Sequence, residues 1–403
     1  MELYKKRISD LGRIVTGKTP RTSNAENYGG KIPFLTPSDD LSGKFAPKTV
    51  KTITELGLSE VRNCLLPSKS VCVSCIGSDL GKVVITNEPT VSNQQFNSII
   101  PTEENDTDFI YYLMTIVGKE LNFLSKTSTA VPIINKSTFA DYEIEIPSLE
   151  NQRRIAKVLS SLDDKIEVNR RINDNLEQQA QALFKSWFVD FEPFRDQTFK
   201  ESEFGMIPNG WHAAVLDELC SFISRGLTPK YDENSDELIL GQTCVRNNVV
   251  TLDNARKHKP KQRTEKWVQQ WDTLINSTGV GSLGRVGIAY FDMDNVAIDS
   301  HITVVRPKSA LVRHYVGRNL LNRQLEIENM AVGSTGQTEL PKERVKSLPI
   351  MLPDENALIR FNAIIEPIAY QLYRNIEESR RLACLRDVLL PRLMSGELTI
   401  ADL

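Results

Sequence analysis

Two short segments of the chain combine glycine and proline with side chains that hydrogen-bond or carry positive charge. Gly17 to Arg21 and Gly226 to Lys230 share the order Gly, variable residue, Thr, Pro, basic residue. Arg, Lys, Asn and Gln side chains on loops can bind base edges, and Lys and Arg also bind phosphate. These residues predict recognition of a polar or anionic partner.

Further segments carry the same chemistry. Asn93 to Gln95 is a polar run, Gln337 is suited to pairing with adenine, and the basic cluster Arg256 to Arg263 suits phosphates better than bases. The predicted contact residues are Lys18, Thr19, Arg21, Asn93, Gln94, Gln95, Asn135, Arg225, Thr228, Lys230, Gln242, Arg246, Arg256, Lys257, Lys259, Lys261, Arg263 and Gln337. Each of them taken singly also fits an ordinary surface or turn role, so the prediction rests on the group.

Motifs for catalysis or cofactor binding are weak. The loop Gly77 to Lys82 has three residues between its glycines and is followed by Val83, where a phosphate-binding loop needs Ser or Thr. Gly281 to Gly287 fits a turn between strands better than a dinucleotide site. Cys72 and Cys75 are a single pair without a nearby His, which favours buried thiols over zinc binding. We therefore expect no catalytic residue, metal site or cofactor on this chain.

The charge of the chain is unevenly distributed. The formal net charge is −3, which argues against binding a polyanion because phosphate contacts need Lys and Arg. Residues 1 to 82 nevertheless contain 13 Lys and Arg against 8 Asp and Glu, and residues 242 to 271 contain 7 against 2. Both stretches could face phosphate, and each taken alone fits an ordinary solvated face equally well.

The size and composition indicate a soluble protein of several domains. A chain of 403 residues suits two or three domains, and 40% hydrophobic with 25% charged residues is ordinary for a folded protein. No window is apolar enough to span a membrane, and the first residues lack the apolar run of a signal peptide. Six scattered cysteines fit reduced thiols, so a cytoplasmic location is expected.

The sequence contains an internal repeat. Asp141 to Phe188 aligns without gaps on Ser347 to Met394 at an offset of 206 residues, and Gly81 to Val83 matches Gly284 to Val286 at 203. Each copy begins with about 140 residues of short β-branched runs, turn signals and one apolar helix-like stretch, Phe109 to Leu124 in the first copy. About 45 residues of helical periodicity follow, which predicts an α+β globule followed by a long helix.

The two predicted long helices have the pattern of a coiled coil. Core positions, most of them apolar, recur by alternating steps of four and three from Ile155 to Trp187 and from Phe361 to Leu393, and Asn169 and Asn375 occupy equivalent seam positions that would fix the register. We expect antiparallel pairing within one chain, and a kink at Pro367. The alternative is that each helix packs only on its own globule.

The predicted fold class is α+β, with two similar α/β globules joined by two long antiparallel coiled-coil helices in a pseudo-twofold repeat. The expected boundaries are residues 1–146 and 193–352 for the globules, and 147–192 and 353–398 for the helices. The seam from Ile155 to Trp187 would run about 50 Å at 1.5 Å per residue, which corresponds to ~14 base pairs of duplex DNA. Two globules at that spacing could read separated half-sites.

The order of globule, helix, globule, helix resembles that of type I restriction–modification specificity subunits. The local sequences are similar too: SDLGRIVTGKTP near the start, KIPFLTPSDD from Lys31, EIPSLENQRRIAKVLSSLDDKI at the first helix, GMIPNGW from Gly205, and LLPRLMSGEL near the end. The second helix opens as LPDENALIRFNAII without the Gln-Arg-Arg run of the first, so its partner contacts are less well defined.

The resemblance implies a non-catalytic, DNA-binding subunit. Each globule, a target recognition domain, would read one half of a bipartite target in double-stranded DNA, and the helices would set the gap and bind two adenine-N6 methyltransferase subunits. Restriction or motor subunits could join. S-adenosylmethionine, ATP and Mg²⁺ would belong to these partners, and the chain has no Asp-Pro-Pro-Tyr or Asn-Pro-Pro-Phe tetrapeptide. The rival hypothesis is a duplicated coiled-coil protein-interaction scaffold without a DNA role.

Overall fold

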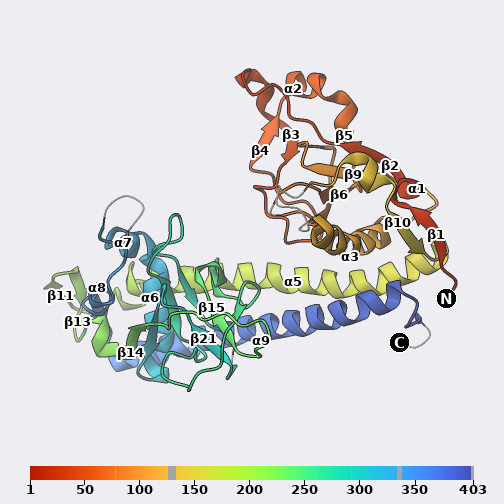
Figure 1. Ribbon diagram of the computed structural model, residues 1–403. Helices are drawn as coiled ribbons and strands as arrows, with labels where there is room; N and C mark the ends of the chain where they lie inside the picture. The colour runs from red at the N-terminus through yellow and green to blue at the C-terminus, as the bar shows by residue number, and fades with distance from the viewer. Residues whose placement is uncertain (78, 126–132, 292, 334–337, 401–403) are drawn as a thin grey trace. The chain divides into compact units, whose positions relative to one another are not determined.

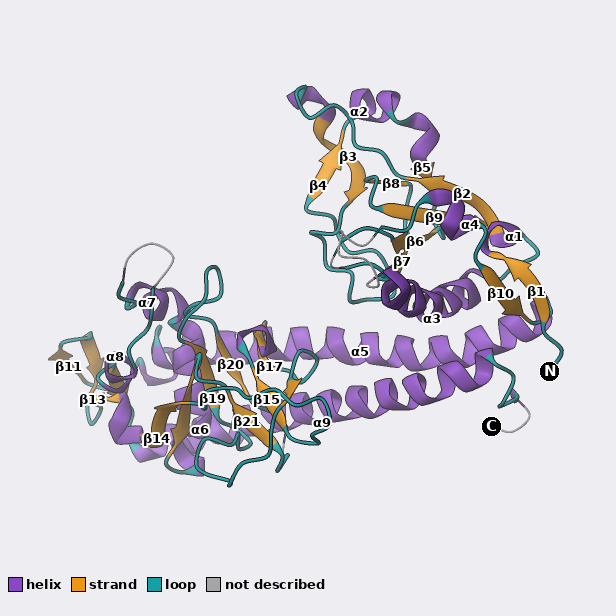
Figure 2. Ribbon diagram, viewed as in Figure 1, coloured by secondary structure: helices purple, strands orange, loops and turns teal. Residues whose placement is uncertain are grey.

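The computed structural model describes the chain except for residues 78, 126–132, 292, 334–337 and 401–403. It divides into two compact units: unit 1 comprises Met1–Glu167 and Arg381–Leu403, and unit 2 comprises Val168–Arg380. Both contain helices and strands, as Figure 2 shows, so the prediction of a mixed α and β fold is confirmed.

Unit 1 contains two four-stranded sheets and one strand pair. The sheet orders are β2-β9-β6-β7 and β4-β3-β8-β5, and β1 pairs with β10. The strands are β1 (Tyr4–Arg7), β2 (Gly12–Thr16), β3 (Tyr28–Leu35), β4 (Lys51–Ile53), β5 (Leu65–Leu66), β6 (Val71–Ser74), β7 (Val83–Ile85), β8 (Thr90–Ser92), β9 (Phe96–Pro101) and β10 (Glu143–Ile146). The helices of the globule are α1 (Ile8–Leu11), α2 (Glu55–Glu60), α3 (Thr107–Ser125) and α4 (Lys136–Ala140).

Unit 2 repeats this arrangement with additions. Its sheets have the orders β14-β22-β19-β20-β17-β16 and β18-β15-β21, and the pairs are β11-β12 and β13-β23. The strands are β11 (Phe199–Ser202), β12 (Gly205–Pro208), β13 (His212–Val215), β14 (Cys220–Arg225), β15 (Leu238–Leu240), β16 (Val245–Arg246), β17 (Asn248–Val250), β18 (Arg256–Lys257), β19 (Thr273–Asn276), β20 (Val286–Ile288), β21 (Val296–Ile298), β22 (Ile302–Pro307) and β23 (Pro349–Leu352). The helices are α6 (Ala310–Asn322), α7 (Gln324–Asn329) and α8 (Lys342–Lys346).

The sheets of the two units share a common set of strands. The order β2-β9-β6-β7 matches β14-β22-β19-β20, and the parallel pair of β3 and β8 matches that of β15 and β21. Helix α3 packs on β6 and β7, and α6 packs on β20 and β22. The internal repeat found in the sequence is therefore also a repeat of backbone topology, and the hairpin of β16 and β17 extends the larger sheet of unit 2.

Two helices of 40 residues, α5 (Leu149–Phe188) and α9 (Glu355–Met394), follow the globules. Helix α5 begins directly after Ser148, and α9 begins directly after Asp354. The carboxylate of Asp354 accepts a hydrogen bond from the backbone N–H of Ala357 at 2.8 Å, as an N-cap side chain does. Pro367 lies inside α9 and does not divide it. None of the helices in the described part of the chain is both long and apolar enough to cross a membrane.

Within each unit, α5 and α9 lie side by side (Figure 1) and are joined by side-chain hydrogen bonds. In unit 2, the amide nitrogen of Asn169 donates to Ser379 at 3.3 Å, and that of Asn375 donates to Asn173 at 2.8 Å. A step of four residues up one helix corresponds to four residues down the other, so the two helices are antiparallel there. In this antiparallel pair, the amide of each Asn bonds to a different polar seam residue of the other helix.

Each hydrophobic core is completed by the end of a long helix. In unit 1 the cluster includes Leu390, Leu393 and Met394 of α9. In unit 2 it includes Phe184, Trp187 and Phe188 of α5, whose rings lie close to one another and to Phe361. These two triplets stand at equivalent positions of the repeat, so each globule is stabilised by the helix of the other copy.

Candidate nucleic-acid interface

The parallel pair of β3 and β8 and that of β15 and β21 end at equivalent hollows. After β8, the backbone N–H of Asn93 donates to the carbonyl of Leu35 at 3.0 Å; after β21, that of Asp299 donates to the carbonyl of Leu240 at 3.0 Å. The unit 1 hollow, of about 400 Å³, is lined by Thr19, Phe34, Thr36, Pro37, Ser38, Lys51, Asn93 and Gln95. The unit 2 hollow, of about 640 Å³, is lined by Tyr231, Gly241, Gln242, Thr243, Asn254, Ala255, Arg256, Asp299 and His301. The same backbone frame thus encloses both.

The glycines of the two Gly-x-Thr-Pro segments bring those loops against the frame. A Cβ atom at Gly17 would lie 2.1 Å from the carbonyl oxygen of Asn93, and one at Gly226 would lie 1.9 Å from that of Ile298. Any side chain would therefore displace the loop from the strand end. The shared Gly is explained by close packing of backbones, while Thr19 reaches the unit 1 hollow.

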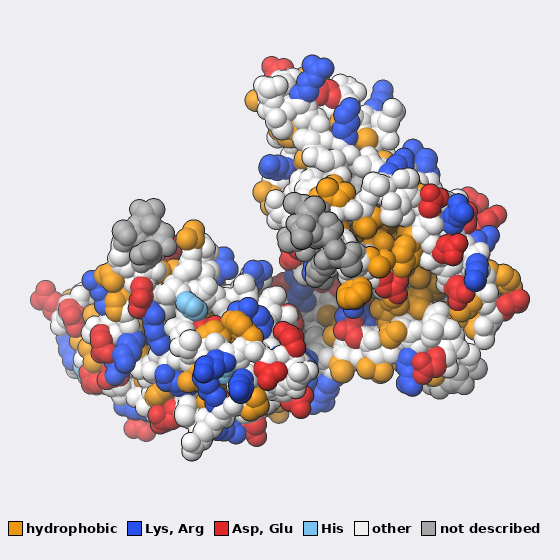
Figure 3. Space-filling model, viewed as in Figure 1, with side chains coloured by type: hydrophobic (Ala, Val, Ile, Leu, Met, Phe, Trp, Pro, Cys, Tyr) orange, Lys and Arg blue, Asp and Glu red, His pale blue; other side chains and the backbone are white. Residues whose placement is uncertain are grey.

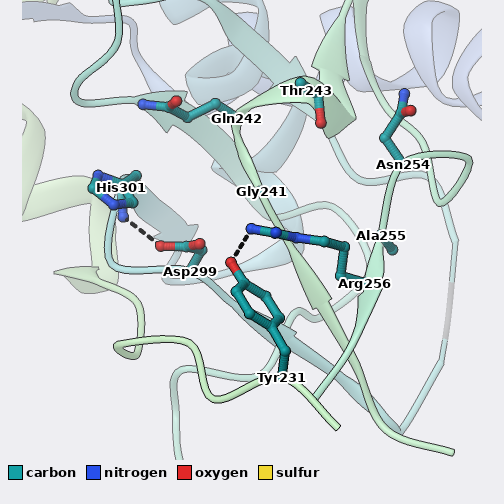
Figure 4. A pocket seen from close by; sticks show the side chains of 9 residues that line it. All are labelled: Tyr231, Gly241, Gln242, Thr243, Asn254, Ala255, Arg256, Asp299 and His301. Atoms are coloured by element: carbon teal, nitrogen blue, oxygen red, sulfur yellow. Dashed lines mark hydrogen bonds between the residues drawn. The ribbon is translucent and has the colours of Figure 1, made fainter. Parts of the chain in front are cut away.

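Arg256 and Tyr231 form one side of the unit 2 hollow. The guanidinium carbon lies 3.6 Å from the ring centroid, and Arg256 also donates a hydrogen bond to the Tyr231 hydroxyl. Figure 4 shows Arg256 reaching toward Tyr231, with Asp299 and His301 together on the opposite side. A cation stacked on a ring is held in place while its remaining N–H groups can donate to a ligand.

Gln242 is held by a short polar chain. Its Nε2 donates to the carbonyl of Thr278 at 2.5 Å and to the hydroxyl of Thr278 at 2.6 Å. That hydroxyl lies 2.9 Å from Nδ1 of His301. Because the amide nitrogen is engaged, Oε1 is the atom of Gln242 suited to accept a hydrogen bond, as the amino groups of adenine and cytosine donate one.

The unit 1 hollow has amides in the matching places. Asn93 is buried, donates to Oε1 of Gln95 at 2.8 Å, and accepts from the Gln95 backbone N–H at 3.0 Å. In unit 2 the carboxylate of Asp299 accepts from the His301 backbone N–H, also at 3.0 Å. Thr19 donates to Gln94 at 2.7 Å. The predicted Thr19, Asn93, Gln94 and Gln95 therefore come together at one site.

Two chain segments, at Lys230–Tyr231 and at Lys257–Lys259, form a basic ribbon beside the unit 2 hollow. Tyr231 and His258 form an antiparallel bridge, the Lys259 N–H donates to the Lys230 carbonyl at 2.7 Å, and the Lys230 N–H donates to Nδ1 of His258 at 3.1 Å. Burial lowers the pKa of His258 because it disfavours the charged ring. Lys230, Lys257 and Lys259 are exposed, and Figure 3 shows Lys and Arg side chains gathered on a face of unit 2. This ribbon fits contact with phosphates.

The remaining predicted residues are placed as follows. Lys18, Arg21, Thr228, Lys261 and Arg246 are exposed, with Arg246 beside the tight turn formed by Asn247 and Asn248 at positive φ. Arg225 is paired with Glu339 at 2.9 Å, Arg263 with Asp294 at 2.7 Å, and Asn135 caps α4 by accepting from the Thr138 N–H at 2.9 Å. Gln337 lies outside the described residues.

Several lining residues were not predicted. Tyr231, Asp299 and His301 stand in the unit 2 hollow, and Lys51 in the unit 1 hollow. The offset of 206 maps Asn93 and Gln95 onto Asp299 and His301, so the repeat could have identified this pair. Tyr231 carries no comparable signal, because it contacts Arg256 only through the folded ribbon.

The Cys72 and Cys75 pair lies in and directly after the central strand β6 of unit 1. Both thiols are buried, and burial raises the pKa of Cys72 to about 12 and that of Cys75 to about 11. The interpretation of these residues as buried thiols is confirmed.

Comparison with known proteins identifies the repeated unit. A family model described as the type I restriction modification DNA specificity domain matches residues 2–178 and 208–377. The chain belongs to this family of DNA specificity proteins. It is 30% identical, over 99% of its length and 94% of the relative, to the type I restriction enzyme MjaIX specificity subunit of Methanocaldococcus jannaschii. It is 36% identical to the HindI specificity subunit of Haemophilus influenzae, over 42% of this chain and 38% of that protein.

The fold comparison agrees with this family. A crystal structure of the type I restriction–modification S subunit from M. genitalium has a TM-score of 0.54 and 17% identity, and covers 98% of this chain and 96% of that one. This chain is therefore a specificity subunit that recognises DNA sequence within a type I restriction–modification system, and its role is recognition and not catalysis. The prediction of the family and of this role is confirmed.

Proposed function

We propose that each unit reads one half of a split DNA target, and that the two hollows are the reading sites. The observation that carries this proposal is their equivalence: the same hydrogen bonds, Asn93 to Leu35 and Asp299 to Leu240, close both. A shared frame with different lining residues suits a protein that reads two different half-sites in one way.

The side chains divide into two roles. Base edges would be contacted in unit 1 by Asn93, Gln95 and Thr19, and in unit 2 by Gln242. These side chains line the hollows and carry forked or hydroxyl groups. Lys230, Lys257 and Lys259 of the basic ribbon, together with the exposed Lys18, Arg21 and Arg246, would contact phosphates. Arg256 is suited to both roles, because it is a cation and it also lines the hollow, where Tyr231 holds it in place.

The long helices are proposed to form an antiparallel coiled coil that sets the unread gap. Every seam position of both helices is buried or half-buried, including Asn169 and Asn375. The proposed boundaries are 1–146 and 193–352 for the recognition domains and 147–192 and 353–398 for the helices. Removing one heptad from each helix, about 10 Å at 1.5 Å per residue, is expected to shorten the gap by ~3 base pairs.

The proposed partners are double-stranded DNA, two methyltransferase subunits on the helices, and restriction subunits. S-adenosylmethionine, ATP and Mg²⁺ would be bound by those partner subunits. The complex would act in the cytoplasm, where the DNA lies. These assignments rest on the family to which the chain belongs.

Methylome sequencing of a host that carries this chain with its methyltransferase partner tests the proposal. A split adenine-methylated motif is expected, and exchanging residues 1–146 for those of a relative should change one half of it. A motif that is unchanged by the exchange would overturn the assignment. The rival scaffold role predicts that the complex does not bind DNA, whereas binding through phosphates should weaken steeply as salt rises.

A further inference from the structure

The loop between β19 and β20 lifts an apolar side chain into solvent. Val280 is 90% exposed, and it stands between two glycines at positive φ, Gly279 at +100° and Gly281 at +72°. Single exposed apolar residues are common on protein surfaces. This one is set apart by the loop that carries it and by its neighbours.

The base of this loop is fixed to the unit 2 hollow. Thr278, directly before Gly279, binds both Gln242 and His301, which line the hollow. The φ of +100° favours glycine at position 279, and a Cβ atom there would lie 2.8 Å from Nε2 of Gln242 and so displace that side chain. Val280 therefore lies two residues after Thr278, the residue that anchors Gln242.

The matching loop of unit 1 has the same anchors and is shorter. The Gly81 N–H donates to Ser74 at 2.8 Å, and the Gly284 N–H donates to Asn276 at 2.9 Å. Two residues separate Gly77 from Leu80, whereas three residues separate Gly279 from Leu283. The added residue of unit 2 therefore falls in the segment that contains Val280, and the sequence of unit 1 has no counterpart of it.

Thymine is the base that an exposed apolar side chain can recognise. In the major groove, bases are distinguished by donors and acceptors, and thymine also presents its C5 methyl group. Gln242 offers a hydrogen-bond acceptor and bonds to Thr278, and Val280, two residues after Thr278, offers an apolar contact. We propose that Val280 contacts the methyl group of a thymine next to the base that Gln242 reads. This inference rests on the proposed function, because it requires the unit 2 hollow to face DNA.

Replacing thymine by deoxyuridine removes the methyl group alone and so tests the contact. The complex of the full chain with its methyltransferase partner would be titrated with duplexes that carry its split target, with each thymine of the unit 2 half-site replaced in turn. One position is expected to weaken binding about fourfold, the change that ~0.8 kcal/mol per buried methyl group produces. Val280→Ala should weaken binding to the thymine duplex by a similar factor and abolish the response at that position.

Leu325→Ala is the matched control, since Leu325 is an apolar residue of the same unit that is 73% exposed on α7; it should leave the response to deoxyuridine intact. The inference is overturned if Val280→Ala keeps the wild-type response at every position, or if it weakens binding equally to thymine and deoxyuridine duplexes, as an inserted wedge would. A half-site without thymine on either strand overturns it too. Absence of any split target would instead contradict the proposed function itself.

Discussion

In unit 1 the residue after β8 is Asn93, and its amide binds both the backbone and the side chain of Gln95; in unit 2 the same place holds Asp299, whose carboxylate binds the backbone of His301. The backbone bonds around both are the same, and the side chains that line the hollows are not. Main-chain hydrogen bonds and glycines thus keep the backbone around the hollow the same in both copies. The side chains that line the hollow, and with them the specificity, can differ between the copies.

The buried charges differ between the units as well. In unit 2, Arg318 is buried and binds Glu177 of α5 and the hydroxyl of Tyr290. In unit 1, Asp163 of α5 binds Tyr112 at 2.5 Å and Arg386 of α9 at 2.7 Å, and Arg386 remains 29% exposed. A carboxylate of α5 thus anchors each globule, and the side chain of its arginine partner is 2% exposed in unit 2 and 29% exposed in unit 1.

The largest expected effect is on stability in unit 2. Arg318→Met leaves the carboxylate of Glu177 buried without its partner, which should cost about 3–5 kcal/mol of unfolding free energy. Arg386→Met in unit 1 should cost less, because that pair is partly solvated. Hydrogen exchange followed by mass spectrometry in each unit measures the two losses, and equal losses would contradict the comparison.

Acid should weaken unit 2 before unit 1. All four histidines lie in unit 2, and burial lowers the pKa of His314 to about 3. A folded-state pKa below the unfolded value of about 6.5 means that the histidine stabilises the fold above pH 6.5 and loses this contribution as pH falls toward 3. Between pH 7 and pH 5 the loss should be about 2 kcal/mol. Protection factors, in which the pH dependence of intrinsic amide exchange is divided out, should fall in unit 2 between pH 7 and pH 5, and His314→Gln should remove this fall; a fall confined to unit 1 would refute this.

Base reading by unit 2 should depend on Gln242. Gln242→Ala is expected to cost about 1 kcal/mol at one base position, the low end for such contacts because its amide nitrogen is already engaged. Binding competition with every single-base variant of the target measures this. Loss of affinity that is uniform over all positions would instead show that Gln242 is structural.

The smallest expected effect is on salt dependence. Lys230→Ala and Lys259→Ala should each reduce the slope of log affinity against log salt by about 0.9, without altering sequence preference. Lys200→Ala on β11 serves as the control and should leave the slope unchanged. A change in preferred sequence would place these lysines at bases.

Much of the frame was predictable from sequence, and much of the site was not. The offset of 206 predicted the repeat, and the Gly-x-Thr-Pro segments marked the loops that enclose the hollows. The stacking of Arg256 on Tyr231 depends on the bridge between Tyr231 and His258, a long-range pairing that no local pattern encodes. Likewise, periodicity placed Asn169 in the seam, but its partner Ser379 follows from the antiparallel register of the folded pair.

The most direct test compares matched variants of the two hollows. Gln95→Ala in unit 1 and Gln242→Ala in unit 2 would each be expressed with the methyltransferase partner, and the methylated motifs read by sequencing. The account predicts that the first relaxes one half of the motif only and the second relaxes the other half only. If both variants relax the same half, or neither changes the motif, the two hollows are not the two reading sites.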